Sequence, residues 1–171
     1  MGGVGEGCGG DVSLHLAQDS PRSLREARGA PVEILLIEDN PDHAELTQRA
    51  LADGGTASRV RWVRDGAEAL DYLGRRGRWA TAPRPGLILL DRRLPTIGGD
   101  EVLRRIKADP TLRSIPVVML TTTDRPEEVR QAYEAGVNSF VTKPVRFQDF
   151  VERVRQIQRY WVLTNQLPRV P

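Results

Sequence analysis

Polar residues that could take part in chemistry stand at the ends of four apolar runs in this sequence. The four segments are ILLIEDN (34–40), LILLDRRLP (87–95), VVMLTT (117–122) and FVTKP (140–144), and their polar ends are Glu38, Asp39, Asp91, Thr121 and Lys143. If the runs are parallel strands, their carboxyl ends lie along one edge of a sheet, where ligand sites form in open α/β folds. Three carboxylates, one hydroxyl and one ammonium would meet there. Such a set fits a divalent cation together with a phosphoryl group.

The acidic residues restrict the chemistry further. Carboxylates about 4 Å apart repel each other by roughly 4 kcal/mol per pair at an effective dielectric constant of 20. A fold that gathers Glu38, Asp39 and Asp91 must therefore hold a cation there or raise the pKa of a carboxyl group. Ligands that are all oxygen suit Mg²⁺. Asp91 could then attack phosphorus and form an acyl phosphate, while Thr121 and Lys143 bind the phosphoryl oxygens.

Each of these residues also has a simpler interpretation when it is taken alone. The Glu38–Asp39 pair could be an acidic turn that caps a helix, and Asp91 could be a turn residue at a strand end. Lys143 could be a loop lysine that faces solvent. However, Lys143 and Lys107 are the only lysines in a chain that otherwise uses arginine, which favours a need for a compact point charge. The joint occurrence of these residues favours a site.

Five strands and five helices in strict alternation are expected to position these residues. Apolar runs without polar alternation indicate strands buried on both faces, and residues 59–63 give a further strand. Asn40 followed by Pro41 marks one helix start, and Asp65 with Glu68 three residues later marks another. The last helix has apolar residues at helical spacing, namely Phe147, Phe150, Val151, Val154, Ile157 and Trp161. This order predicts an α/β fold with a doubly wound five-stranded parallel sheet.

Length and composition agree with one globular domain in the cytoplasm. The chain has 171 residues, and none of its apolar stretches approaches the roughly 20 residues that span a bilayer, so no membrane is expected as a partner. Its single cysteine, Cys8, excludes a disulfide framework and a cysteine-based metal site. Residues 1–30 lack the apolar core of a signal peptide. We expect residues 1–30 to be a disordered tail, or to precede the true translation start, with a domain over 31–161 and a C-terminal tail over 162–171.

A glycine motif near the start of the chain and a positive net charge do not indicate nucleotide or nucleic-acid binding here. Gly5, Gly7 and Gly10 match G-x-G-x-x-G, but this motif binds dinucleotides only between a strand and a helix, and only residues 1–4 precede it. The formal net charge of +2 comes from basic residues that are mixed with Asp and Glu rather than gathered in a dense patch. We therefore expect no nucleic-acid partner.

From about residue 32 to residue 160 the chain resembles the receiver domain of two-component response regulators, a family that includes the chemotaxis regulators. The matching features are the acidic pair Glu38–Asp39 after the first strand, Asp91 after the third with Leu94, Pro95 and Gly99 behind it, Thr121 after the fourth, and Lys143–Pro144 after the fifth. The resemblance implies a flavodoxin-like fold with strand order 2-1-3-4-5.

The resemblance also implies roles for single residues. A partner histidine kinase would transfer a phosphoryl group to Asp91. Mg²⁺ would be bound by Asp39, Asp91 and the backbone carbonyl of Arg93, with Glu38 acting through water. Such a protein would be no enzyme in the ordinary sense, but an acceptor that catalyses its own phosphotransfer and loses the phosphoryl group slowly.

The switch that follows phosphorylation is implied in the same way. Thr121 and Lys143 would bind the phosphoryl group, and Phe140 would be the aromatic residue that turns inward as the threonine moves. The peptide bond between Lys143 and Pro144 would be cis.

The chain departs from the family pattern near Asp91. Gly98 stands where Asp is frequent, and residues 75–86 lengthen the connection into the third strand. Arg92 and Arg93 follow Asp91 directly. By resemblance, Arg93 and Thr123 would set how long the phosphoryl group survives. The side chain of Arg93 could cover the acyl phosphate, pair with a carboxylate or lie in solvent.

The long connection and the Tyr160–Trp161 ending are similar to single-domain regulators that pair with bacterial phytochrome kinases. This similarity implies a bacteriophytochrome kinase as partner, and a homodimer formed through the fourth helix, the fifth strand, the fifth helix and the C-terminal region. The apolar ending itself has two interpretations: a last turn folded back on the domain, or a contact surface for a partner or second copy.

Three function classes can be compared. The first is a phosphorylated signalling module without a DNA-binding output domain, because residues 161–171 are too few for one. The second is a binding scaffold that works without phosphorylation; loss of an acid, the acceptor or the lysine would mark it, and the chain has lost none of them. The third is a phosphatase, but Arg93 occupies the second acid position of the Asp-x-Asp signature. The residues favour the first class.

Overall fold

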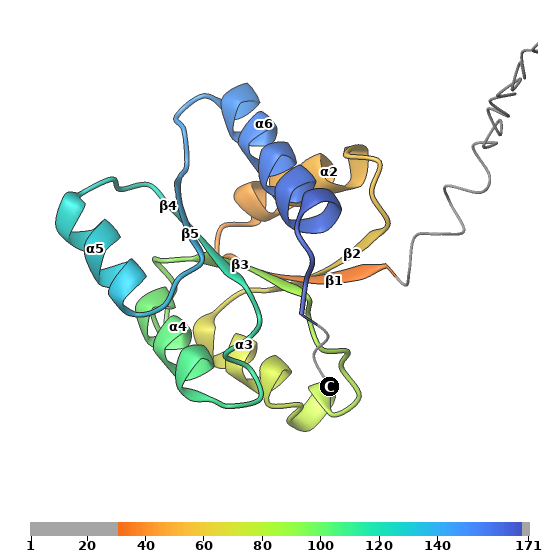
Figure 1. Ribbon diagram of the computed structural model, residues 1–171, viewed down its shortest axis with the longest axis vertical. Coiled ribbons are helices and arrows are strands. Elements are labelled where there is room, and N and C mark those ends of the chain that lie inside the picture. Colours follow the sequence, from red (N-terminus) through yellow and green to blue (C-terminus); the bar gives the residue numbers. More distant parts are fainter. Residues whose placement is uncertain (1–30, 169–171) are drawn as a thin grey trace, which may run out of the picture.

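The computed structural model describes residues 31–168, and in it helices cover both faces of one sheet (Figure 1). The strands are β1 (Val32–Ile37), β2 (Ser58–Val63), β3 (Leu87–Asp91), β4 (Val117–Thr121) and β5 (Ser139–Thr142). The helices are α2 (Pro41–Asp53), α3 (Gly66–Leu73), α4 (Gly99–Ala108), α5 (Pro126–Glu134) and α6 (Phe147–Gln158). The predicted tail over 1–30, its glycine motif and Cys8 lie outside the described residues.

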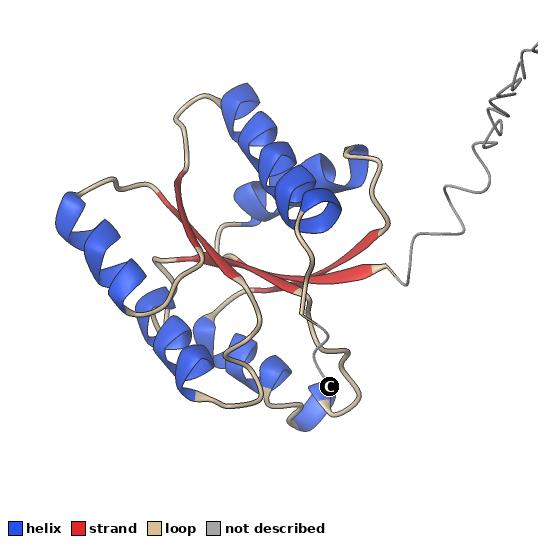
Figure 2. Cartoon of the chain, in the orientation of Figure 1, coloured by secondary structure: helices blue, strands red, loops and turns tan. Residues whose placement is uncertain are grey.

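The sheet has the order β2-β1-β3-β4-β5, and all neighbouring strands are parallel. Helices α2 and α6 cover one face, and α3, α4 and α5 cover the other (Figures 1 and 2). The predicted fold class is confirmed, with one small shift: the second strand begins at Ser58 rather than at Arg59. In residues 31–168, no helix is both long and apolar enough to cross a membrane.

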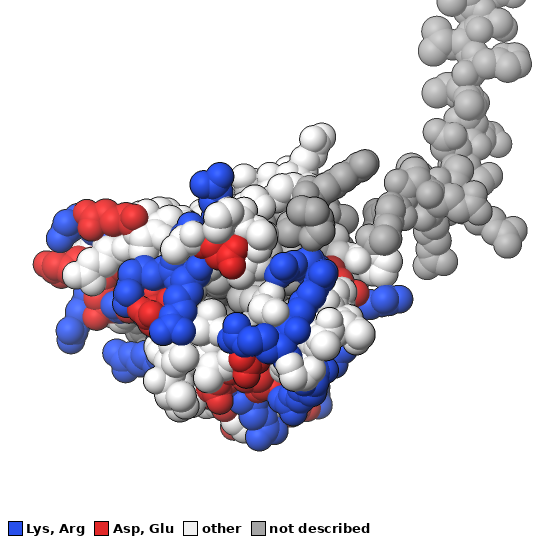
Figure 3. Space-filling model, turned by 90° about the horizontal axis from the view of Figure 1, so that it is seen from below, with Lys and Arg blue, Asp and Glu red and all other residues white. Residues whose placement is uncertain are grey.

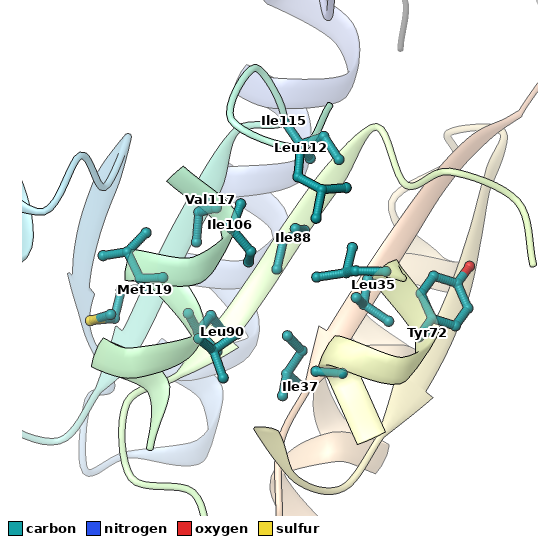
Figure 4. Packing of buried hydrophobic residues seen from close by; sticks show 14 of the residues in the cluster. Leu35, Ile37, Tyr72, Ile88, Leu90, Ile106, Leu112, Ile115, Val117 and Met119 are labelled. Atoms are coloured by element: carbon teal, nitrogen blue, oxygen red, sulfur yellow. The ribbon is translucent and has the colours of Figure 1, made fainter. Parts of the chain in front are cut away.

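The core consists of two clusters, one on each face of the sheet. Since successive side chains of a strand point to opposite faces, Leu35 and Ile37 of β1 enter the cluster under α3 and α4, whereas Ile34 and Leu36 enter the one under α2 and α6. Figure 4 shows the first of these clusters. Strands β3 and β4 are buried along their whole length. Burial on both faces is why these strands read as unbroken apolar runs.

The two helix starts expected from the sequence are formed as capped N-termini. The side-chain oxygen of Asn40 accepts hydrogen bonds from the backbone N–H groups of Asp42 at 2.9 Å and His43 at 3.3 Å. Asp65 accepts one from Glu68 N–H at 2.8 Å. The reciprocal bond of the expected capping box is displaced by one residue, because Glu68 accepts from Arg64 N–H rather than from the cap residue.

The lengthened connection over residues 75–86 packs against the edge of the domain. It contains a short 3-10 helix, Gly77–Trp79, whose Trp79 ring lies edge-on against Tyr72 with 5.1 Å between ring centroids. The guanidinium groups of Arg78 and Arg61 lie 4.8 and 5.6 Å from the same ring. On the surface seen in Figure 3, basic and acidic side chains are mixed, as the sequence predicts.

The last helix continues directly into a π-helical segment, Arg159–Thr164. Trp161 and Val162 pack against the cluster under α2 and α6. Tyr160 and Leu163 point outward and are about half exposed. Trp161 and Val162 thus pack on the domain, as the first interpretation of the apolar ending expects. Tyr160 and Leu163 remain exposed enough to contact a partner, as the second expects.

Candidate functional site

Strand register places the predicted site residues at the same level of the sheet. Ile37 pairs with Leu90, so Glu38 and Asp91 come next to each other at the carboxyl ends of β1 and β3. Thr121 is the last residue of β4, and Lys143 follows β5 directly. The residues that the sequence separates by up to 105 positions therefore meet at one edge of the sheet, where ligands bind in such folds.

Lys143 forms the centre of the site. Its ammonium donates hydrogen bonds of 2.6 Å to Glu38 Oε2 and 2.6 Å to Asp91 Oδ2. Its side chain is 4% exposed, so these ion pairs lie away from water. Lys143 is therefore not a loop lysine that faces solvent. The ammonium of the other lysine, Lys107, donates to the backbone carbonyls of Arg113 and Ile115 and to Asn138 Oδ1. These bonds hold the connection after α4, so the role of Lys107 is structural.

Glu38 is fully buried despite its charge. Its Oε1 accepts from the backbone N–H of Asn40 at 3.3 Å, and its carbonyl accepts from the Trp62 indole at 2.8 Å. Burial raises the pKa of Glu38 from 4.5 to about 7, and repulsion by Asp91 adds to the shift, although Lys143 opposes it. Glu38 therefore binds a proton more readily in the folded protein than a free glutamate does.

His43 is a site residue that sequence reasoning missed. Its Nδ1 lies 3.4 Å from Lys143 Nζ and 3.5 Å from Glu38 Oε1. Burial lowers the pKa of His43, and the Lys143 ammonium adds to the effect. The available signal was positional: His43 lies in the first turn of the helix that follows the acidic pair, on the side of the sheet edge.

The acidic residues form a suitable cation site. Carboxylate oxygens of Glu38, Asp39 and Asp91 lie within 4.8 Å of one another. Three carboxylates and the ammonium of Lys143 sum to a formal charge of −2, which one divalent cation would neutralise. Oxygen donors of this kind suit hard cations such as Mg²⁺, Mn²⁺ or Ca²⁺. The residues present therefore fit a divalent metal, as the sequence predicts.

The other predicted switch residues lie around this centre. Thr121 is buried at the end of β4, and its hydroxyl accepts from Thr123 N–H at 3.3 Å. Its carbonyl accepts from Lys143 N–H at 2.6 Å, which links the two strand ends. Phe140 is partly buried and packs against the cluster under α3 and α4. Thr123 is half-buried, and its hydroxyl accepts weakly from Arg125 N–H at 3.4 Å.

The two arginines after Asp91 behave differently. Arg93 donates its backbone N–H to Asp91 Oδ1 at 3.0 Å, but its side chain is exposed and has no ion-pair partner within residues 31–168. The Arg93 side chain therefore lies in solvent in this structure and is not paired with a carboxylate of the described chain. Arg92, which had no predicted role, turns away from the carboxylates and pairs with Asp100 and Glu128.

The prediction of a cis peptide bond before Pro144 is wrong for this structure. Every peptide bond between residues 31 and 168 is trans. An X–Pro bond prefers the trans form by only about 0.5–1 kcal/mol, so surrounding contacts decide which form is present. Here the residue after Pro144, Val145, is fully exposed.

Comparison with known proteins gives the family. A family model described as the response regulator receiver domain matches residues 34–155. The probable methanogenesis regulatory protein FilR2 of Methanothrix harundinacea is 45% identical over 139 residues, which cover 81% of this chain and 88% of FilR2. Response regulator Rcp1 of Synechocystis sp. is 39% identical over 145 residues, which cover 85% of this chain and 99% of Rcp1.

Solved structures agree with these relatives. The Mn²⁺-bound form of Rcp1 matches with a TM-score of 0.79 and covers 81% of this chain and 100% of that one. The phosphorylated cyanobacterial phytochrome response regulator RcpA is 42% identical, has a TM-score of 0.79, and covers 82% of this chain and 100% of that one. The chain therefore belongs to the response regulator receiver domain family and is a response regulator of two-component signal transduction.

Proposed function

We propose that this response regulator accepts a phosphoryl group from a histidine kinase on Asp91, with Mg²⁺ as cofactor, and signals through a change in conformation. The observation that carries the proposal is the position of the Asp91 carboxylate, which lies 2.6 Å from the Lys143 ammonium and within the same acidic cluster as Glu38 and Asp39. A carboxylate held in this way has a cation to balance the incoming charge and two neighbouring carboxyl groups that could hold a metal with it.

The residues around Asp91 prepare it for attack on phosphorus. Arg93 N–H binds Oδ1 and Lys143 binds Oδ2, so the carboxylate is held in one orientation. In the transfer, a carboxylate oxygen bonds to phosphorus while the bond from phosphorus to the donor's imidazole nitrogen breaks. The nitrogen keeps the electron pair and takes a proton from solvent. Lys143 then binds a phosphoryl oxygen as a point charge.

The metal site would serve the same step. Glu38, Asp39, Asp91 and the Arg93 carbonyl are the groups proposed to hold Mg²⁺, with Glu38 acting through water. When bound, Mg²⁺ would neutralise charge that develops on the phosphoryl oxygens. The structure of Rcp1 with Mn²⁺ supports a divalent ion in a relative of this chain.

The proposed switch links the phosphoryl group to the α5–β5–α6 side of the domain. Thr121 would turn its hydroxyl from Thr123 N–H to a phosphoryl oxygen, and Phe140 would move inward into the space left by the threonine. Phe140 is only partly buried in this structure and packs against the cluster under α3 and α4. After signalling, slow hydrolysis of the acyl phosphate would reset the protein.

The partner kinase is proposed to be a bacteriophytochrome. RcpA, 42% identical to this chain, is a phytochrome response regulator, and this relationship supports the proposal. A homodimer through α5, β5, α6 and the C-terminal segment is proposed as well. Tyr133 of α5 and Tyr160 and Leu163 of the C-terminal segment are each about half exposed, which would let them enter such a contact. Sedimentation velocity with and without beryllofluoride tests it: a monomer under both conditions argues against a dimer.

The decisive experiment is phosphorylation by acetyl phosphate. With Mg²⁺, the protein should gain one phosphoryl group that is labile to hydroxylamine, as acyl phosphates are. Asp91→Asn should gain none, whereas Asp109→Asn, an acid at the far end of α4, should be labelled like the wild type. Labelling that persists in Asp91→Asn would exclude Asp91 as the acceptor. An unlabelled wild-type protein would instead favour the phosphorylation-independent scaffold.

A further inference from the structure

His43 lies at the site without a part in the proposed phosphoryl transfer. Its Nδ1 is 3.4 Å from Lys143 Nζ, and its ring lies beside Phe150 of α6 with 6.1 Å between centroids. The side chain is 39% exposed. The ring therefore contacts the ammonium and is also partly accessible to solvent.

A chain of contacts that begins and ends at Glu38 positions the His43 ring. Glu38 Oε1 binds the backbone N–H of Asn40, and Asn40 Oδ1 binds the backbone N–H of His43. The His43 ring then reaches Lys143, and Lys143 returns to Glu38. Thus the residue that caps α2 also places the imidazole.

A bound cation would change which partners Lys143 keeps. The two carboxylates that hold its ammonium, those of Glu38 and Asp91, belong to the acidic cluster that fits the metal. A divalent cation would coordinate the carboxylate oxygens and repel the Lys143 ammonium, which would weaken both ion pairs. His43 is not a member of that cluster, so its nitrogen is a partner for which the cation does not compete.

We propose that His43 is a positioning residue whose neutral imidazole accepts a hydrogen bond from the Lys143 ammonium and keeps it beside Asp91 when a cation occupies the carboxylates. This inference rests on the proposed acceptance of a phosphoryl group by Asp91. An ammonium can only donate, so the ring nitrogen that faces it at 3.4 Å is the acceptor when the ring proton is on Nε2. The role is to hold a group that binds the phosphoryl oxygens, not to contact the reacting atoms.

The test compares two substitutions of nearly equal shape. His43→Asn puts an oxygen acceptor where Nδ1 lies, and His43→Leu puts a methyl group there. The rate of phosphorylation by acetyl phosphate at saturating Mg²⁺ should fall about tenfold in His43→Leu and stay within about threefold of the wild type in His43→Asn. Leu46→Ala is the matched control, because Leu46 lines the same pocket of about 220 Å³ beside His43 and should keep the wild-type rate.

Two further measurements separate positioning from other roles. Mg²⁺ affinity by calorimetry should be unchanged in His43→Leu; a loss that matches the loss of rate would mean that His43 acts on the metal and would overturn the proposal. In a Lys143→Met background, which has no ammonium to position, His43→Leu should lower the rate little further, and an additive loss would argue against the role.

Failure of this inference can be told from failure of the proposed function. If the wild-type protein takes up a phosphoryl group and His43→Leu takes it up equally fast, only the role of His43 is wrong. If the wild-type protein takes up none, phosphoryl acceptance itself is wrong. The Asn and Leu variants differ only in polarity at one position, so a general loss of folding would affect both and is detected by thermal unfolding.

Discussion

Arg92, the residue directly after the proposed acceptor, forms an ion pair with Glu128 in the first turn of α5. The same guanidinium donates from Nε to both carboxylate oxygens of Asp100, at 3.0 and 3.1 Å, in the first turn of α4. Its side chain is 15% exposed. One side chain therefore ties the acceptor loop to the start of two helices, and α5 is a part of the proposed output face.

Glu128→Gln should loosen the start of α5. Loss of the ion pair is expected to lower the free energy of unfolding by about 1 kcal/mol or less, since the pair is only partly shielded from water. Amide hydrogen exchange should become faster over residues 126–130. Glu127→Gln is the control, because it removes an exposed acid from the same turn. Equal exchange in the two variants would show that the ion pair does not hold the helix.

The stability of the metal-free protein should fall as pH rises from about 5 to about 7. Burial and the neighbouring Asp91 raise the pKa of Glu38 from 4.5 to about 7. Between these values the folded protein keeps a proton that the unfolded chain releases, so the free energy of unfolding decreases with pH, by up to about 3 kcal/mol. Urea unfolding in EDTA at pH 5 to 8 measures the slope. Glu38→Gln should lack this pH dependence. If the difference in free energy of unfolding between wild type and Glu38→Gln stays constant from pH 5 to 8, the raised pKa of Glu38 is contradicted.

Mg²⁺ should stabilise the folded protein through the acidic cluster. A ligand that binds only the folded state at 100 times its Kd adds about 2.7 kcal/mol. Thermal unfolding with increasing Mg²⁺ should show a rising Tm in the wild type and a much smaller rise in Asp39→Asn. Asp42→Asn, an exposed acid of the α2 first turn outside the cluster, is the control and should behave like the wild type. An undiminished rise in Asp39→Asn would place the metal elsewhere.

Arg93→Asn should shorten the lifetime of the acyl phosphate, on the order of threefold, if the arginine covers it after phosphorylation. Its guanidinium is exposed and without an ion pair in the described chain, so it is free to turn toward the phosphoryl group. The measurement is the hydrolysis half-life of the phosphorylated protein, with the exposed Arg113→Asn as control. Equal half-lives in wild type and Arg93→Asn would remove this role and direct attention to Thr123.

Much of the fold and the site could be predicted because both depend on short, local patterns. Strands β3 and β4 are buried throughout, so their apolar runs could not be mistaken for half-exposed strands. Once the runs are parallel, the chain direction alone brings Asp91 and Lys143 to the same edge. The helix caps Asn40 and Asp65 are also local, since each bonds to a residue two or three positions later.

The rest depends on contacts between distant residues or on small energy differences. His43 and Lys143 are 100 residues apart, and Arg92 and Glu128 are 36 apart. The position of His43 after the acidic pair places it near the sheet edge, but no local pattern identifies the partner in either contact. Phe147 fits the helical spacing of α6 but is 57% exposed, because it lies in the first turn beyond the edge of the core. The trans bond before Pro144 depends on a preference of less than about 1 kcal/mol, which the sequence does not resolve.

The glycine pair at the start of α4, Gly98 and Gly99, tests how closely this helix must approach the acceptor strand. A Cβ on Gly99 would lie 2.3 Å from the Asp91 carbonyl and 2.8 Å from Arg92 Cα, whereas one on Gly98 would meet nothing within 4 Å. Gly99→Ala must therefore push α4 away from the acceptor loop. We expect it to destabilise the protein by about 1–3 kcal/mol and to slow phosphorylation.

Gly98→Ser is the matched change one position earlier. Gly98 is the N-cap of α4 and has no side chain to accept a hydrogen bond from the first turn. A serine hydroxyl there could accept one, so stability should stay unchanged or rise by about a few tenths of a kcal/mol. Urea unfolding and acetyl phosphate labelling of both variants give the comparison. Equal effects of the two substitutions would mean that the contact between Gly99 and the acceptor strand does not limit the site, and that α4 can shift without disturbing Asp91.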